Sequence, residues 1–244
     1  MNISKWVCTG TALYAALLAG AAAAQSVALD IGHFLDKPGA TSARGREEFS
    51  FNRELALEIE RALKRRGLRT QLIGTDGAPI RLSARATQGR GTDFFLSVHH
   101  DSVQPHFLET WEHAGEARNF SDRYAGFSLF VSRRNSALEA SLACASALGE
   151  ALRRAGFRPS LYHADPIAGE SKPFADRANG VHYYDNLVVL KSAASPAVLF
   201  EAGVIVNRDE ELVLGQAGTR ERIAVAVAAG LGGCLDAKGT KRER

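Results

Sequence analysis

The chain has 244 residues, 45% of them hydrophobic, and a formal net charge of +3 at pH 7. This length suits one α/β domain with a substantial core. The mild charge and the absence of a basic stripe argue against a nucleic-acid-binding protein. Residues 237–244 hold a short basic stretch that we expect to be a solvated tail.

The first 24 residues have the pattern of a signal peptide. Lys5 is followed by an apolar run over 12–24, which is shorter than the roughly 20 residues that span a bilayer. Ala22, Ala23 and Ala24 supply the small residues that signal peptidase accepts. We therefore expect cleavage before Gln25 and an exported mature chain, with a retained membrane anchor as the alternative. Cleavage removes Lys5 alone among the charged residues, so the net charge falls from +3 to +2.

Two cysteines remain after cleavage, Cys144 and Cys234. An exported protein meets an oxidising compartment, where these cysteines could pair. The sequence leaves a disulfide and two buried thiols equally open, because it does not show whether the Cα atoms come within about 7 Å of each other. Neither cysteine belongs to a CxxC motif of a metal or redox site.

The first half of the mature chain predicts alternating strands and helices. Residues 26–32 form a short apolar run typical of a buried strand, and the polar, glycine-rich segment 37–46 predicts a loop. A long helix begins at Glu48, with apolar residues repeating every four positions, and ends at Gly67. A strand over 69–73 and a short helix over 80–88, with Leu82 and Ala86 facing inward, follow.

The second half continues the pattern with two less regular segments. Residues 93–99 predict a strongly apolar strand, followed by an irregular, aromatic and acidic segment over 102–126, part of which could cap a cleft. The remaining predicted elements are a strand over 127–132, a helix over 137–154, a loop-rich stretch over 158–186, a strand over 197–202 and a helix over 220–231 stopped by Gly232 and Gly233.

This alternation indicates an α/β fold: a single domain with a mostly parallel twisted sheet and helices on both faces. We place the domain at residues 25–236, since no internal repeat or linker divides it. In open α/β sheets, sites lie at the carboxyl ends of the strands. His33, Glu48, His99 and Glu201 all fall at that edge.

These four residues have the composition of a catalytic zinc site: two imidazoles, one ligating carboxylate and one further carboxylate for proton transfer. Zinc enzymes typically use three protein ligands and leave one position open. Each residue also has a simpler explanation, such as a turn histidine or a buried structural carboxylate. Glu47 competes with Glu48, and His100 competes with His99. Neighbouring residues on a strand point to opposite faces, so only one of these two histidines is expected in the site.

Five segments, in order along the chain, carry a resemblance to a known family. They are Leu29–His33, Glu48–Asn52, Arg81–Arg85, Asp93–His99 and Pro196–Asn207. In these segments the chain resembles the zinc-dependent N-acetylmuramoyl-L-alanine amidases of the amidase-3 type, which are bacterial cell-wall hydrolases. The resemblance covers most of the mature chain.

The resemblance implies that His33, Glu48 and His99 bind Zn²⁺ and that Glu201 is the catalytic carboxylate. The implied reaction is hydrolysis of the amide between N-acetylmuramic acid and the L-alanine of the stem peptide, in cell-wall turnover or daughter-cell separation. The Ser-Val-His register favours His99 over His100, and the register with Asn52 favours Glu48 over Glu47. Two positions depart from the family pattern, Phe34 and Val204. Phe34 would stand beside the metal and narrow the cleft.

Further expectations follow from the same comparison. Some relatives carry a plug helix after the strand that corresponds to 127–132, but here that strand leads almost directly into a helix, so we expect activity without an activator. We expect a periplasmic monomer that acts on peptidoglycan or muropeptides, without a membrane anchor after cleavage. The alternatives are another zinc amidohydrolase or carboxypeptidase, and a catalytically silent wall-binding domain. We expect His106, His113, His163 and His182 to be surface or loop histidines.

Overall fold

The computed structural model describes the backbone of residues 24–242 and the side chains of residues 24–236. The predicted signal peptide therefore lies outside the described residues, except for Ala24. Among the residues described, no helix combines the length and the apolar character needed to cross a membrane.

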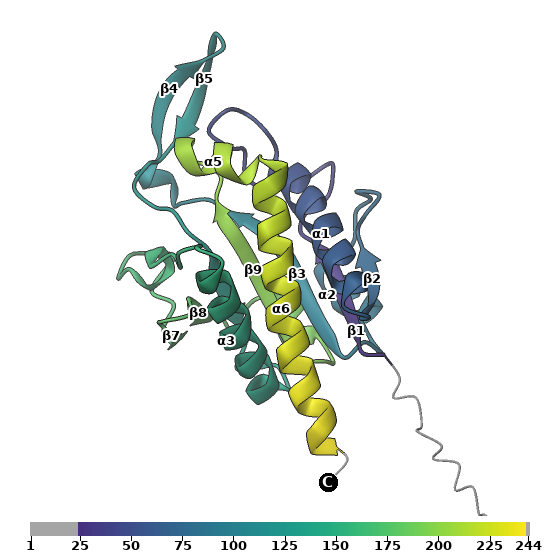
Figure 1. The fold of residues 1–244 in the computed structure, drawn as a ribbon. Helices are drawn as coiled ribbons and strands as arrows, with labels where there is room; N and C mark the ends of the chain where they lie inside the picture. The colour runs from purple at the N-terminus through teal and green to yellow at the C-terminus, as the bar shows by residue number, and fades with distance from the viewer. Residues whose placement is uncertain (1–23, 243–244) are drawn as a thin grey trace, which may run out of the picture.

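A seven-stranded sheet forms the centre of the molecule (Figure 1). Its strands are β1 (Ser26–Ile31), β2 (Arg69–Ile73), β3 (Phe94–Asp101), β6 (Ser128–Val131), β7 (Phe174–Asp176), β8 (Val181–Tyr183) and β9 (Ala197–Val204). They lie in the order β2-β1-β3-β9-β6-β8-β7. The β1–β2, β1–β3, β3–β9 and β6–β8 pairs are parallel, whereas β6–β9 and β7–β8 are antiparallel. The prediction of a mostly parallel α/β sheet is confirmed.

Helices cover both faces of this sheet. Three long helices pack on one face and two short ones on the other, while a further short helix follows β9 (Figure 1). The long helices are α1 (Glu48–Arg65), α3 (Leu138–Arg154) and α6 (Ala217–Arg242); the short ones are α2 (Leu82–Gln88), α4 (Val188–Ser192) and α5 (Arg208–Leu214).

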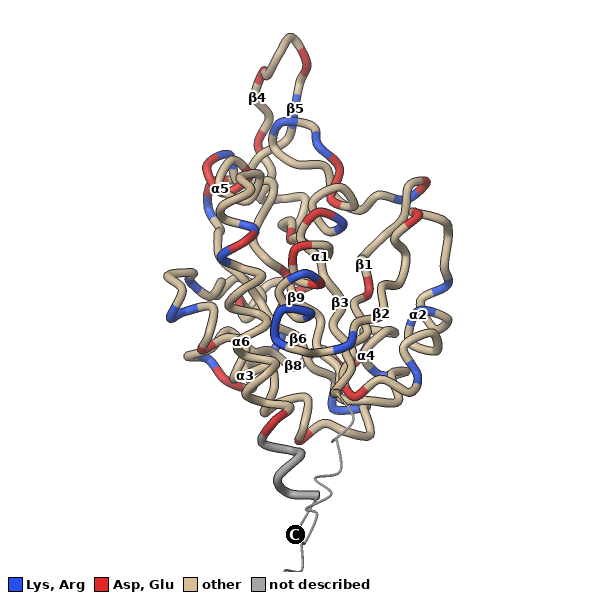
Figure 2. The backbone as a smooth tube through the Cα atoms, turned by 45° about the vertical axis from the view of Figure 1, so that its right-hand side comes forward, with Lys and Arg blue, Asp and Glu red and all other residues tan. Residues whose placement is uncertain are grey.

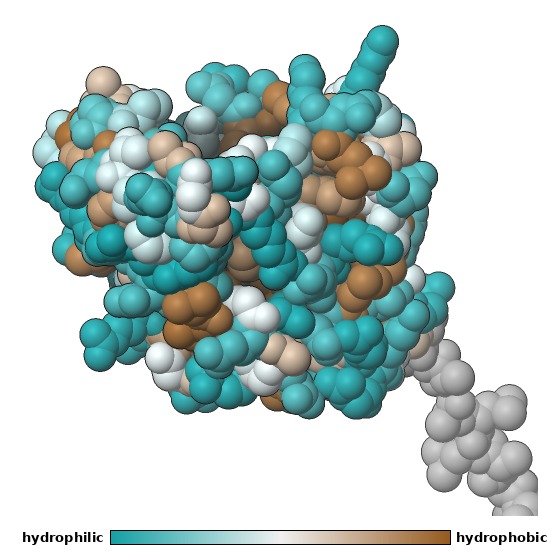
Figure 3. All heavy atoms as spheres, turned by 90° about the horizontal axis from the view of Figure 1, so that it is seen from above, coloured by the Kyte–Doolittle hydropathy of each residue, from teal (hydrophilic) through white to brown (hydrophobic). Residues whose placement is uncertain are grey.

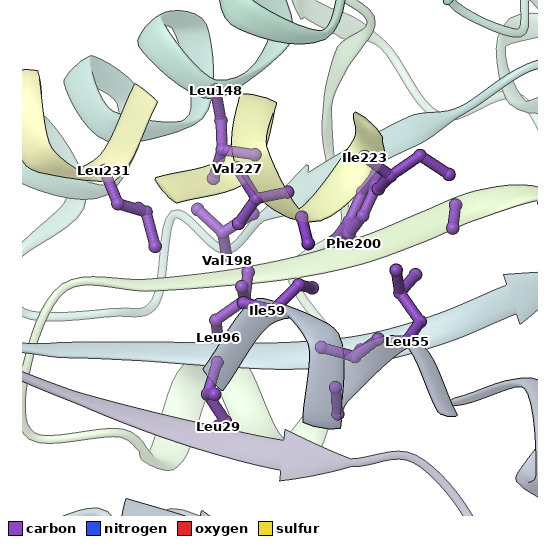
Figure 4. Close-up of a cluster of buried hydrophobic side chains, with 14 of the residues drawn as sticks. Leu29, Leu55, Ile59, Leu96, Leu148, Val198, Phe200, Ile223, Val227 and Leu231 are labelled. Carbon is purple, nitrogen blue, oxygen red and sulfur yellow. The ribbon is translucent and has the colours of Figure 1, made fainter. Parts of the chain in front are cut away.

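The main core lies between the sheet and the three long helices (Figure 4). Leu29, Leu96 and Val198 come from three adjacent strands and meet Ile59 of α1 and Val227 of α6, all fully buried. Residues that neighbour these in each strand, such as Ala28, Phe95 and Leu199, point to the opposite face of the pleated sheet and form a second core beneath α2 and α4. Each such buried side chain contributes about 1.5–3 kcal/mol to folding.

The segment 102–126 is more regular than the sequence predicts. It contains a single 3₁₀ turn (Pro105–Phe107) and a hairpin of β4 (Glu109–His113) and β5 (Glu116–Phe120) that projects from the body of the domain (Figure 1). Ala114 and Gly115 form its tight turn, both at positive φ. Ala-Gly is a weak hairpin signal compared with Asn-Gly, which explains why the sequence did not reveal it.

Other boundaries also differ from prediction. The last helix does not stop at Gly232 and Gly233: α6 continues to Arg242, with Cys234 and Leu235 buried against the core beyond the glycines. Leu82 is 55% exposed rather than inward, although Ala86 is buried as expected. The stretch 158–186 contains a 3₁₀ turn (Tyr162–Ala164) and the strands β7 and β8, which are too short to show a hydrophobic period.

Cys144 and Cys234 form a disulfide between α3 and α6, with Cα atoms 5.2 Å apart. The sequence left this pairing open. The bond closes a sequence separation of 90 residues and lies within the main core. It therefore links α6, the last helix, covalently to α3.

We expect the Cys144→Ala/Cys234→Ala variant of the mature chain to lose about 2–5 kcal/mol of unfolding free energy, because a bond across a long loop restricts the unfolded chain. Urea unfolding of the oxidised protein measures this loss. Reduced wild-type protein is the matched control and should be destabilised to a similar degree. Equal stability of oxidised and reduced wild-type protein would contradict the expectation.

Candidate active site

Three of the four predicted site residues gather at the carboxyl edge of the sheet. The possible ligand atoms of His33, Glu48 and His99 all lie within 4.8 Å of one another. The Glu48 carboxylate links the two imidazoles: its Oε2 is 3.0 Å from His33 Nε2 and its Oε1 is 3.1 Å from His99 Nδ1. These are imidazole and carboxylate donors of the kind that zinc enzymes use.

The backbone around this group is unusually close to the side chains. His33 itself has a positive φ of 68°, two residues after the end of β1. Gly39, at φ 85°, approaches Glu48 so closely that a Cβ there would lie 2.2 Å from Oε2. Gly32 is similarly restricted, since its Cβ would lie 2.3 Å from the His99 ring. Both glycines are required for the three side chains to meet.

Glu48 opens α1 and points back toward β3. Its carboxylate also accepts hydrogen bonds from the Ala40 backbone N–H (3.0 Å) and from the Asn52 amide (3.0 Å). Burial acts to raise the pKa of Glu48, but the hydrogen bonds from His33 and His99 outweigh it and hold the pKa well below its usual value. Its rival Glu47 is exposed and precedes the first turn of the helix.

His99 and His100 point to opposite faces of β3, as predicted. His99 faces the side of α2 and α4, where Glu48 reaches it around the edge of the sheet. His100 is buried against Phe51 of α1, with its Nδ1 2.8 Å from the Asn52 side-chain oxygen. Burial lowers the pKa of His100 to about 3, so this ring is neutral. The structure thus brings His99, and not His100, into the group.

Glu201 lies beside His99 on the neighbouring strand. The two residues are paired in the parallel β3–β9 register, and Ser128 of β6 is the partner of Glu201 on its other side. β9 runs on to Val204, so Glu201 does not end its strand as expected. The Glu201 Oε2 atom is buried and has no hydrogen-bond partner among the described residues.

The environment of Glu201 favours its protonated form. Burial, followed by the negative charges of Asp101 and Glu48, raises the pKa of Glu201 well above its usual value. A buried carboxyl oxygen without a partner is costly in a folded protein, and such atoms occur where a ligand or a reacting group completes the contact.

A second polar cluster stands next to Glu201, and the sequence did not reveal it. His163, expected as a surface or loop histidine, lies in a 3₁₀ turn of the loop-rich stretch but is buried between two carboxylates: its Nε2 is 2.7 Å from Asp101 and its Nδ1 2.8 Å from Glu170. Lys172 also binds Glu170, at 2.6 Å. His182 is buried as well, contrary to expectation. His163 belongs to no recognisable motif. Its partner Asp101 is 62 positions away, and Glu170 lies 7 positions away in a segment without hydrophobic periodicity.

Two cavities meet at the site. One, of about 690 Å³, is lined by His33, His99 and the residues of α2 and α4 that face them. The other, of about 220 Å³, is lined by Glu201 and the His163 cluster. Leu187 and Leu199 line both cavities and separate them. No residue of 107–120 lines either cavity, so the hairpin does not cap them.

Comparison with known proteins identifies the family of the chain. A sequence model of the N-acetylmuramoyl-L-alanine amidase family (Amidase_3) matches residues 27–232. N-acetylmuramoyl-L-alanine amidase AmiA of Salmonella typhimurium is 28% identical over 216 residues, covering 84% of this chain and 74% of that protein. AmiA of Escherichia coli matches to the same extent.

Solved structures share the fold. Ami1 of Mycobacterium smegmatis, an N-acetylmuramyl-L-alanine amidase, superposes with a TM-score of 0.70 at 22% identity, covering 87% of this chain and 97% of that one. The catalytic domain of CwlV from Paenibacillus polymyxa gives 0.65 at 25% identity, covering 87% and 98%. The chain described here belongs to the N-acetylmuramoyl-L-alanine amidase family of the amidase-3 type.

The His163 cluster predicts a pH-dependent stability. Burial acts to lower the pKa of His163, but Asp101 and Glu170 outweigh it and raise the pKa to about 9. Because the folded-state pKa lies above the unfolded value of about 6.5, the contribution is complete below about pH 6.5 and is lost as the pH rises through 9. We expect a loss of up to about 3 kcal/mol over that range.

Urea unfolding at several pH values between 6 and 10 tests this expectation. The His163→Gln variant should be less stable than wild type at pH 6 and should approach it at pH 10. His106→Gln, which changes an exposed histidine, is the control and should keep the wild-type profile. A constant difference between His163→Gln and wild type at every pH would contradict the expectation.

Proposed function

We propose that the protein is a zinc-dependent N-acetylmuramoyl-L-alanine amidase that hydrolyses the amide between N-acetylmuramic acid and the L-alanine of peptidoglycan stem peptides. The observation that supports this most directly is the meeting of His33, Glu48 and His99 beside Glu201, whose Oε2 atom is buried and has no hydrogen-bond partner among the described residues. Membership of the amidase family supports the choice of substrate.

The residues suit zinc as the cofactor. Two imidazole nitrogens and one carboxylate are a common ligand set of catalytic zinc sites that leave a position open for substrate or water. His33, Glu48 and His99 would hold the ion, and the 690 Å³ cavity beside them leaves access to it. Zinc would supply Lewis-acid polarisation of the amide carbonyl and a lowered pKa for water.

Glu201 would carry out the proton transfers. Its raised pKa makes its ionised form a stronger base than an exposed glutamate, and suits it to take a proton from the attacking water. The same carboxyl would then return the proton to the departing nitrogen of L-alanine, which must leave as an amine. The buried Oε2 atom of this carboxyl is held away from bulk water, which helps to keep the proton within the site.

The setting of this activity is part of the proposal. We propose an exported, periplasmic monomer that acts in cell-wall turnover or daughter-cell separation without an activator. The short connection between β6 and α3, which spans residues 132–137, supports activator independence because it leaves no room for a plug helix. Full dependence of cleavage on a partner protein would overturn that part.

The choice of metal ligands can be tested by zinc affinity. We expect His99→Gln to weaken zinc binding by more than about 100-fold, whereas His100→Gln, which acts through Asn52, should weaken it by less. Calorimetric titration of the metal-free proteins with zinc measures both affinities, and circular dichroism checks folding. Stronger loss in His100→Gln than in His99→Gln would reverse the assignment.

The role of Glu201 can be tested with purified peptidoglycan. We expect Glu201→Gln to bind zinc as wild type does and to lower kcat by about 10²–10⁴-fold, since it removes the group that moves the proton. Mass spectrometry should show zinc-dependent release of stem peptides with a free N-terminal alanine, abolished by chelator. Release of other products, or full activity in Glu201→Gln, would contradict the proposed reaction.

A further inference from the structure

The larger of the two cavities at the site is lined mainly by apolar residues, together with His33, His99 and four charged residues. Ile80, Leu187 and Val189 are among its lining residues, together with Leu82, which remains 55% exposed on α2. A leucine left exposed at the wall of a cavity is a common feature of ligand-binding sites. Seen from above, the surface shows a hollow with apolar side chains set among hydrophilic ones (Figure 3).

The charges of this cavity are unbalanced. Arg85 and Asp30 are both buried and pair with each other at 2.7 Å, so they cancel. The other charged groups are Lys37 and Arg81, both exposed cations. Within residues 24–236, neither has an ion-pair partner. Basic residues are prominent on and beside α2 (Figure 2). The cavity therefore presents two free positive charges and no free negative charge in its lining.

The backbone segments that carry the two cations are restrained relative to the metal-binding group. Lys37 follows His33 in a turn closed by two backbone hydrogen bonds between Phe34 and Lys37, at 3.3 and 3.1 Å. Arg81 precedes the first turn of α2, and Arg85 anchors that helix by donating to the carbonyls of Ile31 and His33. The same contact that fixes the His33 backbone thus fixes the helix that follows Arg81.

We propose that this cavity binds the stem peptide of the substrate and that Lys37 and Arg81 select peptides with a free carboxylate on the residue after L-alanine. The inference rests on the proposed amidase function. An apolar wall suits the aliphatic parts of a short peptide, and the cavity volume of about 690 Å³ is large enough for several residues. Two unpaired cations at its rim complement an anionic peptide and not a neutral sugar.

The test compares two muramoyl peptides that differ only at the residue after L-alanine, which carries either a carboxylate or a carboxamide. We expect the zinc-loaded wild-type protein to cleave the carboxylate form with a kcat/KM about three- to tenfold higher, as two exposed charge pairs allow. The Lys37→Gln/Arg81→Gln variant should lose this preference through a higher KM for the carboxylate form alone. Arg65→Gln/Arg90→Gln removes the same charge at exposed positions outside the cavity lining and should keep the preference.

Binding of the two free stem peptides, measured by calorimetry, provides a second readout that does not depend on cleavage. If the wild type binds the carboxylate peptide more tightly and Lys37→Gln/Arg81→Gln loses this difference, the proposed selection is supported. This holds even if neither muramoyl peptide is cleaved. Absence of cleavage would instead reject the proposed amidase reaction. Equal affinities for both peptides in the wild type, or an unchanged preference in the double variant, would overturn the selection by Lys37 and Arg81.

Discussion

The buried guanidinium of Arg85 holds the site together. It pairs with Asp30 and donates to the carbonyls of Ile31 and His33, while Ser97 donates to the other oxygen of Asp30. Removing one partner of such a buried pair costs about 3–5 kcal/mol, because the other charge remains unpaired. The contact joins the end of β1 to α2 and restrains His33 at a positive φ, a conformation that is uncommon for residues other than glycine. One arginine thus fixes both the backbone of His33 and the helix that forms one wall of the cleft.

Around this frame, two glutamates experience opposite environments. Glu48 is surrounded by hydrogen-bond donors, which keep it ionised despite burial. Glu201 has neighbouring negative charges and an oxygen without a partner, which favour its neutral form. Carboxyl groups whose environments separate their pKa values in this way can perform different tasks in one site. The division follows from position: Glu48 meets loop amides at the start of a helix, whereas Glu201 lies within a strand, where neighbouring backbone groups are already paired.

The sequence predicts those features that depend on local periodicity. The apolar repeat of α1 and the runs of β1, β3 and β9 identify the central elements, and the two-residue period of a strand is enough to separate His99 from His100. The missed features depend on contacts between distant segments. His163 pairs with Asp101 across 62 positions, and α6 continues past two glycines because packing and the disulfide stabilise the helix beyond them. Such contacts leave no periodic pattern in one sequence.

The two sides of the cleft carry charges of opposite sign, and this difference follows from the topology. On the side of β1 and α2, the lining carries the cations Lys37 and Arg81. On the side of β6, it carries the carboxyl groups of Asp101, Glu170 and Glu201. When Glu201 is ionised, the positive charges of His163 and Lys172 offset these three negative charges only in part. The boundary falls at Leu187 and Leu199, next to His99 and Glu201. A cation bound by His33, Glu48 and His99 would lie close to this boundary. Its charge would then offset that of the carboxylates where an amide bond must be polarised, while the low dielectric of the apolar wall strengthens the interaction.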